Sequence, residues 1–340
     1  MPCIRGYRQR NFSGKGRADG CDRRDPPGYD PSSERPGGNA MTVETHPALK
    51  DHKDAIPLSG FSGATVALVP VGQRSFVRKA ANSREGNAGL RDQASRQHQL
   101  SGLIADCARM PAILDMGEID GYFYFDMEYV PSRDAINLLS NSPFHCVSDF
   151  ADRVERLMTC LSETASSSPS PLTPTIGLIE DKLAQIAAKT QGRFTDRLRP
   201  LEDAVARMGT LMEPARTTAV HGDLTFENVL VDRHGRLWLI DTIASPFDHY
   251  WIDWSKLFQE CEGLWHAHRG RPLARGVTWW LRQRFYAAAT ALDPAWPIRH
   301  YVLLGLTFAR ILPYARTDAD QAFVGRRVEE CGRAANELLS

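Results

Sequence analysis

The segment HGDLTFENVL places three polar side chains at fixed intervals: His221, Asp223 and Asn228. A further carboxylate, Asp241, follows Asn228 by thirteen residues, at the end of RLWLID. Phosphoryl transfer depends on positioning and charge neutralisation more than on covalent help from the protein. Asp223 would orient an attacking hydroxyl and accept its proton, and Asn228 and Asp241 would hold Mg²⁺, which prefers oxygen ligands. His221 would brace the loop through a hydrogen bond.

Each of these residues, taken alone, is more typical of a structural role. Asp223 and Asn228 would then cap a turn, and Asp241 would end a strand. Together they favour a functional site, because NVLVD and LWLID are β-prone and RHG between them predicts a turn. Such a hairpin would deliver Asn228 and Asp241 to the same end.

The elements before this segment are mostly β-prone. From about Leu58, SGATVALVPV and SFVRKAA predict a hairpin, a helix is expected over about 89–105, and AILDMGEIDGYFYFDMEYV predicts two more strands. Beyond Pro131 the pattern is mainly helical, with 219–241 as the exception. This order predicts an α+β fold, with a small sheet covered by one helix before a larger helical part.

Composition excludes several classes of function. The 340 residues include 41 Lys and Arg against 41 Asp and Glu, so no global field favours nucleic acid or an anionic membrane. Apolar stretches such as YVLLGLTFARIL are too short to span a bilayer, and no apolar segment of a secretory signal begins the chain. Seven scattered cysteines suit reduced thiols, so we expect a cytoplasmic protein.

The motif HGDLTFEN followed by LIDT resembles the aminoglycoside phosphotransferase and choline kinase-like family, which shares the protein-kinase fold. That family has Gly after the His where protein kinases usually have Arg, and Gly222 agrees with it. The family also often lacks the Phe-Gly that follows the metal-binding Asp, and Asp241 is followed here by Thr-Ile. The resemblance extends over about 58–335, and its specific part is 221–256.

The resemblance implies a bilobal protein-kinase-like fold. Residues 56–130 would form a small β-rich, nucleotide-binding N-lobe, and 131–340 a larger helical C-lobe that carries catalysis and the acceptor. Residues 1–55 are rich in Gly, Arg, Asp and Pro and cannot bury enough apolar surface to offset the entropy of ordering, so we expect a disordered extension. Whether residues 1–40 belong to the mature protein stays open.

The resemblance also implies a cation on the third strand that holds the nucleotide phosphates. SFVRKAA offers Arg78 and Lys79, and strand alternation favours Lys79, because it shares a face with Val77, which is small enough to lie beside adenine. The fold usually pairs this lysine with a Glu on the following helix, but LRDQASRQHQL offers Gln93 and Gln97 there. We expect Gln93 to orient Lys79 through a hydrogen bond.

Two further segments would complete the nucleotide pocket. In SGFSGATV, backbone N–H groups of Ser62 and Gly63, with those of nearby residues, would cover the phosphates, although Gly and Ser also mark ordinary turns. FDMEYV resembles the adenine-binding hinge, in which Glu128 would offer its carbonyl and Val130 its N–H, with Met127 behind them. A buried edge strand is the alternative for FDMEYV.

The segment DHYWIDWSKLFQ resembles the helix start at which the family braces its catalytic loop. Asp253 would supply this brace. Lys256 would meet Asp253 or the substrate, or lie on a solvated helix face, and the sequence favours the last. Aromatic side chains around them would wall an acceptor pocket or pack in the core: Phe247, Tyr250, Trp251 and Trp254.

The function expected from these residues is transfer of the γ-phosphoryl group of ATP, with Mg²⁺, to a hydroxyl of a small molecule such as a sugar or amino alcohol. The mixed to basic run CEGLWHAHRGRPLARG disfavours a polycationic acceptor. A nucleotide-binding pseudokinase, an aminoglycoside-modifying enzyme and a protein kinase are the alternatives. A protein kinase is disfavoured because Asp253 follows Asp241 by only twelve residues. ATP against GTP and the oligomeric state stay open.

Overall fold

The computed structural model describes residues 42–58, 63–166, 168, 170–212 and 216–340. The predicted disordered extension lies outside the described residues as far as residue 41. The rest of it, 42–55, contains the short 3₁₀ helix η2 (Pro47–Leu49), in which Ala48 and Leu49 are buried.

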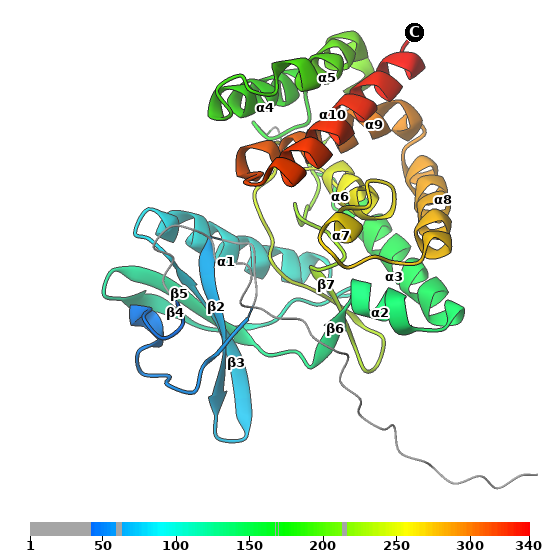
Figure 1. Ribbon diagram of the computed structural model, residues 1–340. Coiled ribbons are helices and arrows are strands. Elements are labelled where there is room, and N and C mark those ends of the chain that lie inside the picture. The colour runs from blue at the N-terminus through cyan, green and yellow to red at the C-terminus, as the bar shows by residue number, and fades with distance from the viewer. Residues whose placement is uncertain (1–41, 59–62, 167, 169, 213–215) are drawn as a thin grey trace, which may run out of the picture. The chain divides into compact units, whose positions relative to one another are not determined.

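The N-terminal part is a five-stranded antiparallel sheet in the order β1-β2-β3-β5-β4 (Figure 1). Its strands are β1 (Ile56–Pro57), β2 (Ala64–Val71), β3 (Arg74–Ala81), β4 (Ile113–Ile119) and β5 (Tyr122–Glu128). Helix α1 (Gly86–Leu103) packs against β3 and β5. The predicted order of two strands, a helix and two strands is confirmed, with the short edge strand β1 added.

Both faces of the centre of this sheet are covered, which explains why 42–55 is ordered. One face packs on α1, where Val77 joins Leu90 in an apolar cluster. On the other face, Val43 and Leu49 cluster with apolar residues of β2. The sequence of 42–55 has few apolar residues, but these cover a sheet face that would otherwise meet water.

The C-terminal part is mostly helical, as predicted. Its helices are α2 (Ala135–Asn141), α3 (Phe144–Glu163), α4 (Ile176–Lys189), α5 (Thr195–Met208), α6 (Trp251–Cys261), α7 (Trp265–His268), α8 (Arg275–Leu292), α9 (Trp296–Ala309) and α10 (Asp318–Leu338), with the 3₁₀ helices η3 (Gly209–Met212) and η4 (Leu312–Tyr314). Figure 1 shows α10 alongside α5 and α9, the helices on which it packs most extensively. The predicted α+β class is therefore confirmed, while the division at residue 130 stays a prediction.

A second, three-stranded sheet interrupts the helices. It consists of β6 (Ser132–Asp134), β7 (Val229–Asp232) and β8 (Leu237–Leu239), all antiparallel. Helix α6, which follows this sheet, is buried on every side, and its apolar residues belong to the main core. Within the described ranges, no helix is both long enough and apolar enough to cross a membrane.

Candidate active site

The β7–β8 hairpin brings Asn228 and Asp241 to one end of the small sheet. Val229 pairs with Leu239, and the N–H of Ile240 donates to the carbonyl of Asn228 at 3.1 Å. Asn228 therefore stands just before β7, and Asp241 just after β8, as the hairpin prediction required. Asp241 has a φ of 63°, a left-handed conformation that is uncommon outside glycine and tends to occur at functional sites.

The loop that begins at His221 is held by a buried carboxylate of α6. The oxygens of Asp253 accept hydrogen bonds from the backbone N–H groups of His221 at 2.8 Å and Gly222 at 2.9 Å. Asp253 is fully buried, and burial raises its pKa to about 7, against the lowering effect of these two hydrogen bonds. The predicted brace is confirmed.

Gly222 allows this loop to meet the segment after Asp241. The carbonyl of His221 accepts a hydrogen bond from the N–H of Ile243 at 3.1 Å. Gly222 has a φ of 86°, and a Cβ on it would lie only 2.1 Å from the carbonyl oxygen of Ile243. Only glycine fits here without a backbone shift, which gives a physical reason for Gly at the position where protein kinases usually have Arg.

His221 has the structural role that was expected. Its side chain is fully buried, and its Nδ1 accepts a hydrogen bond from the N–H of Asp223 at 3.3 Å. Burial lowers the pKa of His221 to about 4, although nearby carboxylates act in the opposite direction. The imidazole is therefore neutral at pH 7 and serves as a hydrogen-bond acceptor within the loop.

Asp223, the predicted catalytic carboxylate, is fixed by two side chains. Its Oδ1 lies 2.9 Å from Nζ of Lys256, and its Oδ2 accepts from Nδ2 of Asn228 at 2.9 Å. Burial raises the pKa of Asp223, but the charge and hydrogen bond of Lys256 outweigh it, so the pKa lies below its usual value. The expectation that Lys256 lies on a solvated face is wrong, because α6 is buried all round and Lys256 is 6% exposed.

The donor set at the hairpin end fits Mg²⁺. The amide nitrogen of Asn228 is committed to Asp223, donating to its backbone carbonyl at 2.8 Å and to its carboxylate, so the amide oxygen is the atom of Asn228 that a cation would bind. Asp241 adds a carboxylate that is 28% exposed. No group of three or more His, Cys, Asp or Glu side chains among the described residues could hold a metal. An ion here would therefore need phosphate and water ligands as well, as Mg²⁺ commonly does.

Lys79 and Arg78 face different surroundings. Nζ of Lys79 lies 2.7 Å from Oδ1 of Asp241, with the lysine side chain 1% exposed. Arg78 forms a bidentate ion pair with Asp126, with both distances 2.7 Å, and donates to the carbonyl of Ala48. Lys79 is thus the cation that reaches the predicted metal-binding residue, and Arg78 is committed to the opposite face of the sheet. That Lys79 holds phosphates stays a prediction.

Gln93 contacts the site by another route than expected. Its amide nitrogen donates to the carbonyl of Thr242 at 2.8 Å, and Thr242 Oγ1 donates back to the carbonyl of Gln93 at 3.4 Å. Gln93 therefore binds α1 to the residue after Asp241, and the expected hydrogen bond to Lys79 does not occur between these described side chains. Lys79 is instead paired with Asp241.

The remaining nucleotide-pocket residues stay predictions. Ser62 lies outside the described residues, and Gly63, just before β2, has open space around its Cα. The N–H of Glu128 donates to the carbonyl of Ala112 at 2.9 Å, and the contact of its carbonyl with adenine stays a prediction. The carbonyl of Val130 accepts from Oγ of Ser132 at 2.9 Å.

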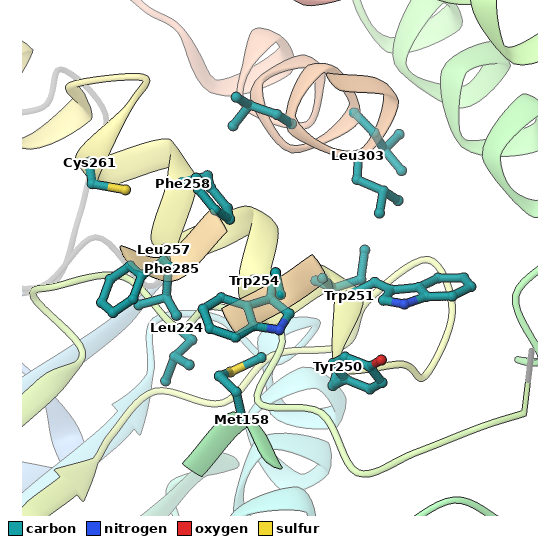
Figure 2. Packing of buried hydrophobic residues seen from close by; sticks show 14 of the residues in the cluster. Met158, Leu224, Tyr250, Trp251, Trp254, Leu257, Phe258, Cys261, Phe285 and Leu303 are labelled. Atoms are coloured by element: carbon teal, nitrogen blue, oxygen red, sulfur yellow. The ribbon is translucent and has the colours of Figure 1, made fainter. Parts of the chain in front are cut away.

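The aromatic residues near the site belong to the core. Figure 2 shows Trp254, Tyr250 and Trp251 within the main apolar cluster, and Phe247 belongs to the same cluster. None of the four is more than 6% exposed, so core packing is the correct alternative. Tyr250 and Trp251 also border a cavity of about 370 Å³, but its described lining does not include Asp223.

Arg310 is a second cation near Asp223 that the sequence motifs did not identify. It directly follows α9, and its Nη2 donates to the carbonyl of Ala244 at 3.3 Å. Burial lowers the pKa of Arg310, and the charge of Asp223 acts in the opposite direction. The run FARILPYAR contained this arginine, but no spacing rule connects it with a loop almost ninety residues earlier.

The chain belongs to the phosphotransferase enzyme family, whose model matches residues 55–241, more than half of the chain. No curated protein was found to match the chain. Among solved structures it is similar to a thermostable mutant of the aminoglycoside phosphotransferase APH(4)-Ia in ternary complex with AMP-PNP and hygromycin B, at 17% identity over 83% of this chain and 94% of that one, with a TM-score of 0.61.

Two other solved structures are similar at a lower level. The GDP and kanamycin complex of APH(2")-IIia has 17% identity over 84% of this chain and 94% of that one, with a TM-score of 0.53. The choline kinase LicA from Streptococcus pneumoniae has 12% identity over 83% of this chain and 93% of that one, with a TM-score of 0.53. At these identities the likeness shows the fold alone, and the predicted kinase-like fold is confirmed.

Proposed function

We propose that this protein transfers the γ-phosphoryl group of ATP to a hydroxyl of a small molecule. The observation that carries the proposal is the position of the Asp223 carboxylate, which Lys256 and Asn228 hold beside the end of the β7–β8 hairpin. A carboxylate in this position is suited to orient a hydroxyl and accept its proton. Membership of the phosphotransferase family supports the reaction class.

The nucleotide would lie between the sheet and the hairpin end. Lys79 would grip its phosphates, and Asn228 and Asp241 would hold Mg²⁺, which when bound neutralises phosphate charge. Solved structures of the same fold contain AMP-PNP, ADP or GDP, which supports a nucleoside triphosphate as donor. Because Lys79 and Asp241 already form an ion pair, nucleotide and Mg²⁺ would bind together and separate the two side chains.

For the acceptor we propose a sugar, an amino alcohol or a related metabolite of the cytoplasm. The described cysteines are all free thiols, which agrees with a reducing compartment. A pseudokinase is the alternative of a different class, because no Glu among the described residues pairs with Lys79. The intact set of Asp223, Asn228 and Asp241 argues against it.

Replacement of Asp223 by Asn tests the reaction. ADP release with a panel of sugars and amino alcohols should fall at least roughly a hundredfold, because an amide cannot accept the hydroxyl proton. Binding of Mg·AMP-PNP, measured by calorimetry, should stay within about twofold, since Asp223 is not assigned to the nucleotide. Asp196→Asn, at an exposed position of α5, is the matched control.

Two outcomes would contradict the proposal. Turnover by Asp223→Asn at the wild-type rate would show that another group serves as the base. If the wild-type protein binds nucleotide but releases no ADP with any acceptor, and none by slow hydrolysis, the pseudokinase is favoured.

A further inference from the structure

Arg310 is partly buried beside the segment that follows Asp241, and its guanidinium forms no ion pair among the described residues. One of its terminal nitrogens, Nη2, donates to the carbonyl of Ala244, three residues after Asp241. The other, Nη1, is buried and has no hydrogen-bond partner among the described residues. A guanidinium stays protonated at all ordinary pH values, so Arg310 cannot avoid the cost of an unpaired charge by losing its proton. Burial without a counter-ion is unfavourable.

The carboxylates whose charges reach Arg310 are occupied by other groups. They are Asp223 and Asp253, both of which raise its pKa, while burial has the larger, lowering effect. Asp223 is paired with Lys256 and Asn228. Asp253 accepts two backbone hydrogen bonds from the 221–228 loop. Neither is available as the missing anion.

A further cation lies on the same side of the site. Lys182, on α4, is half-buried, and its pKa is lowered first by burial and then by the charge of Arg310. Helix α4 packs against α9 and η4, the elements that flank Arg310. Arg310 and Lys182 therefore form a basic pair next to the loop that carries Asp223, and they would repel a cationic acceptor.

We propose that the acceptor bears an anionic group, a carboxylate or a phosphate, which Arg310 binds with the support of Lys182 while the hydroxyl of the same molecule faces Asp223. The proposal rests on the phosphotransferase function proposed above and specifies its substrate class. The guanidinium suits such a group because its N–H donors match two oxygens of a carboxylate or phosphate. An aminoglycoside, as a polycation, does not fit this pair, and neither does a simple cationic amino alcohol, so the acceptors proposed above are narrowed to sugars and related metabolites that bear an anion.

In the resulting step the acceptor oxygen forms a bond to the γ-phosphorus as the bond from that phosphorus to the bridging oxygen of ADP breaks. The hydroxyl proton passes to Asp223, and ADP leaves with the bonding electron pair. The anionic group takes no part in this exchange. Arg310 is therefore a specificity residue and not a catalytic one.

Calorimetry on the full chain saturated with Mg·AMP-PNP tests the inference. The probes are two matched sets: glycerol, glycerate and glycerol 3-phosphate, and glucose, glucuronate and glucose 6-phosphate. We expect at least one anionic member to bind roughly tenfold or more tightly than its uncharged counterpart, as hydrogen bonds to charged groups allow. The carboxylate and phosphate arms show which anion is preferred.

The variant Arg310→Gln should remove this preference, and Arg316→Gln, at an exposed position six residues later, should keep it. Where Arg310→Gln fails to fold, Lys182→Gln decides, and its anion preference should fall at least roughly threefold through loss of one nearby charge. Equal or tighter binding of the uncharged compounds in both sets overturns the inference. So does an anion preference that survives in the deciding variant.

The two proposals fail in different ways. Loss of Mg·AMP-PNP binding in the wild-type protein, or no ADP release with the compound that binds, counts against the phosphotransferase function. Arg310-dependent anion binding without turnover would support the anion site and would count against the phosphotransferase function. Equal weakening of Mg·AMP-PNP and acceptor binding by Arg310→Gln would instead assign Arg310 to the nucleotide phosphates, and would overturn the inference.

Discussion

Nζ of Lys256 and Oδ1 of Asp223 lie 2.9 Å apart, and this pair sets the charge of the carboxylate on which the proposed reaction depends. Lys256 is fixed by a helix that is buried on every side, and its Nζ also donates to Oε1 of Gln259 at 3.0 Å. Because the lysine is held within the core, its Nζ lies beside the carboxylate of Asp223 and favours the ionised form of that carboxylate. Through this pair, the buried helix α6 positions the carboxylate of the proposed reaction.

Replacement of Lys256 by Met should raise the pKa of Asp223, because burial would then act with less opposition. The acid limb of the profile of kcat/KM against pH should move to higher pH, and kcat/KM at pH 7 should fall roughly tenfold to hundredfold. Lys256→Arg, which keeps the charge, should leave the acid limb nearer its original position. An unchanged limb in Lys256→Met would mean that Lys256 does not control the ionisation of Asp223.

Variants of the neighbouring residues Arg78 and Lys79 should separate an effect on stability from an effect on nucleotide binding. Arg78→Met leaves Asp126 buried without its partner and should lower the free energy of unfolding by about 3–5 kcal/mol, measured by urea unfolding. Lys79→Met should instead weaken Mg·AMP-PNP binding by roughly tenfold or more, measured by calorimetry. If Arg78→Met, studied under conditions where it is folded, weakened nucleotide binding more than Lys79→Met, the assignment of the two residues would be reversed.

Replacement of Gly222 by Ala should disrupt the contact between the 221–228 loop and Ile243. The new Cβ would meet the carbonyl of Ile243 at 2.1 Å, so the backbone must shift. We expect a loss of stability of more than about 1 kcal/mol and a large fall in kcat. Gly89→Ala is the control, since Gly89 lies within α1 with open space around it, and it should raise stability by about 1 kcal/mol. Wild-type activity in Gly222→Ala would show that the loop can move without penalty.

The parts of the site that could be predicted from sequence are those fixed by local geometry. The spacing of Asn228 and Asp241 specifies a hairpin whose open end carries both, and strand alternation assigns Lys79 rather than Arg78 to that side of the sheet. Asp253 could be placed because DHYWIDWSKLFQ resembles the helix start at which the family braces its catalytic loop.

The parts that could not be predicted depend on contacts across the fold. Asp253, Lys256 and Glu260 recur at helical spacing in α6, which is typical of a solvated polar stripe, yet the structure buries this stripe. Arg310 reaches the site only because α9 packs on α6. Residues 42–55 are ordered because a sheet face needs cover, which their own composition does not reveal.

Two buried histidines should make folding sensitive to acid. Burial lowers the pKa of His221 to about 4 and that of His249 to about 3, and the charge of Arg299 adds to the effect at His249. Because an unfolded histidine has a pKa of about 6.5, the unfolded state binds more protons at intermediate pH. Their contribution to stability is therefore complete above about pH 6.5 and is lost as the pH falls towards the folded values. Asp253, whose pKa is raised, acts with the opposite sign over part of this range.

Comparison of variants isolates the histidine effect from that of Asp253. The free energy of unfolding of the wild-type protein, minus that of His249→Gln, should fall by about 2 kcal/mol between pH 7 and pH 5. Urea unfolding at several pH values measures this difference. His145→Gln, at an exposed position of α3, controls for the loss of a histidine as such. If the difference in free energy of unfolding between wild type and His249→Gln stays constant with pH, the fold does not hold His249 neutral. Local opening would then let His249 take up a proton without loss of stability.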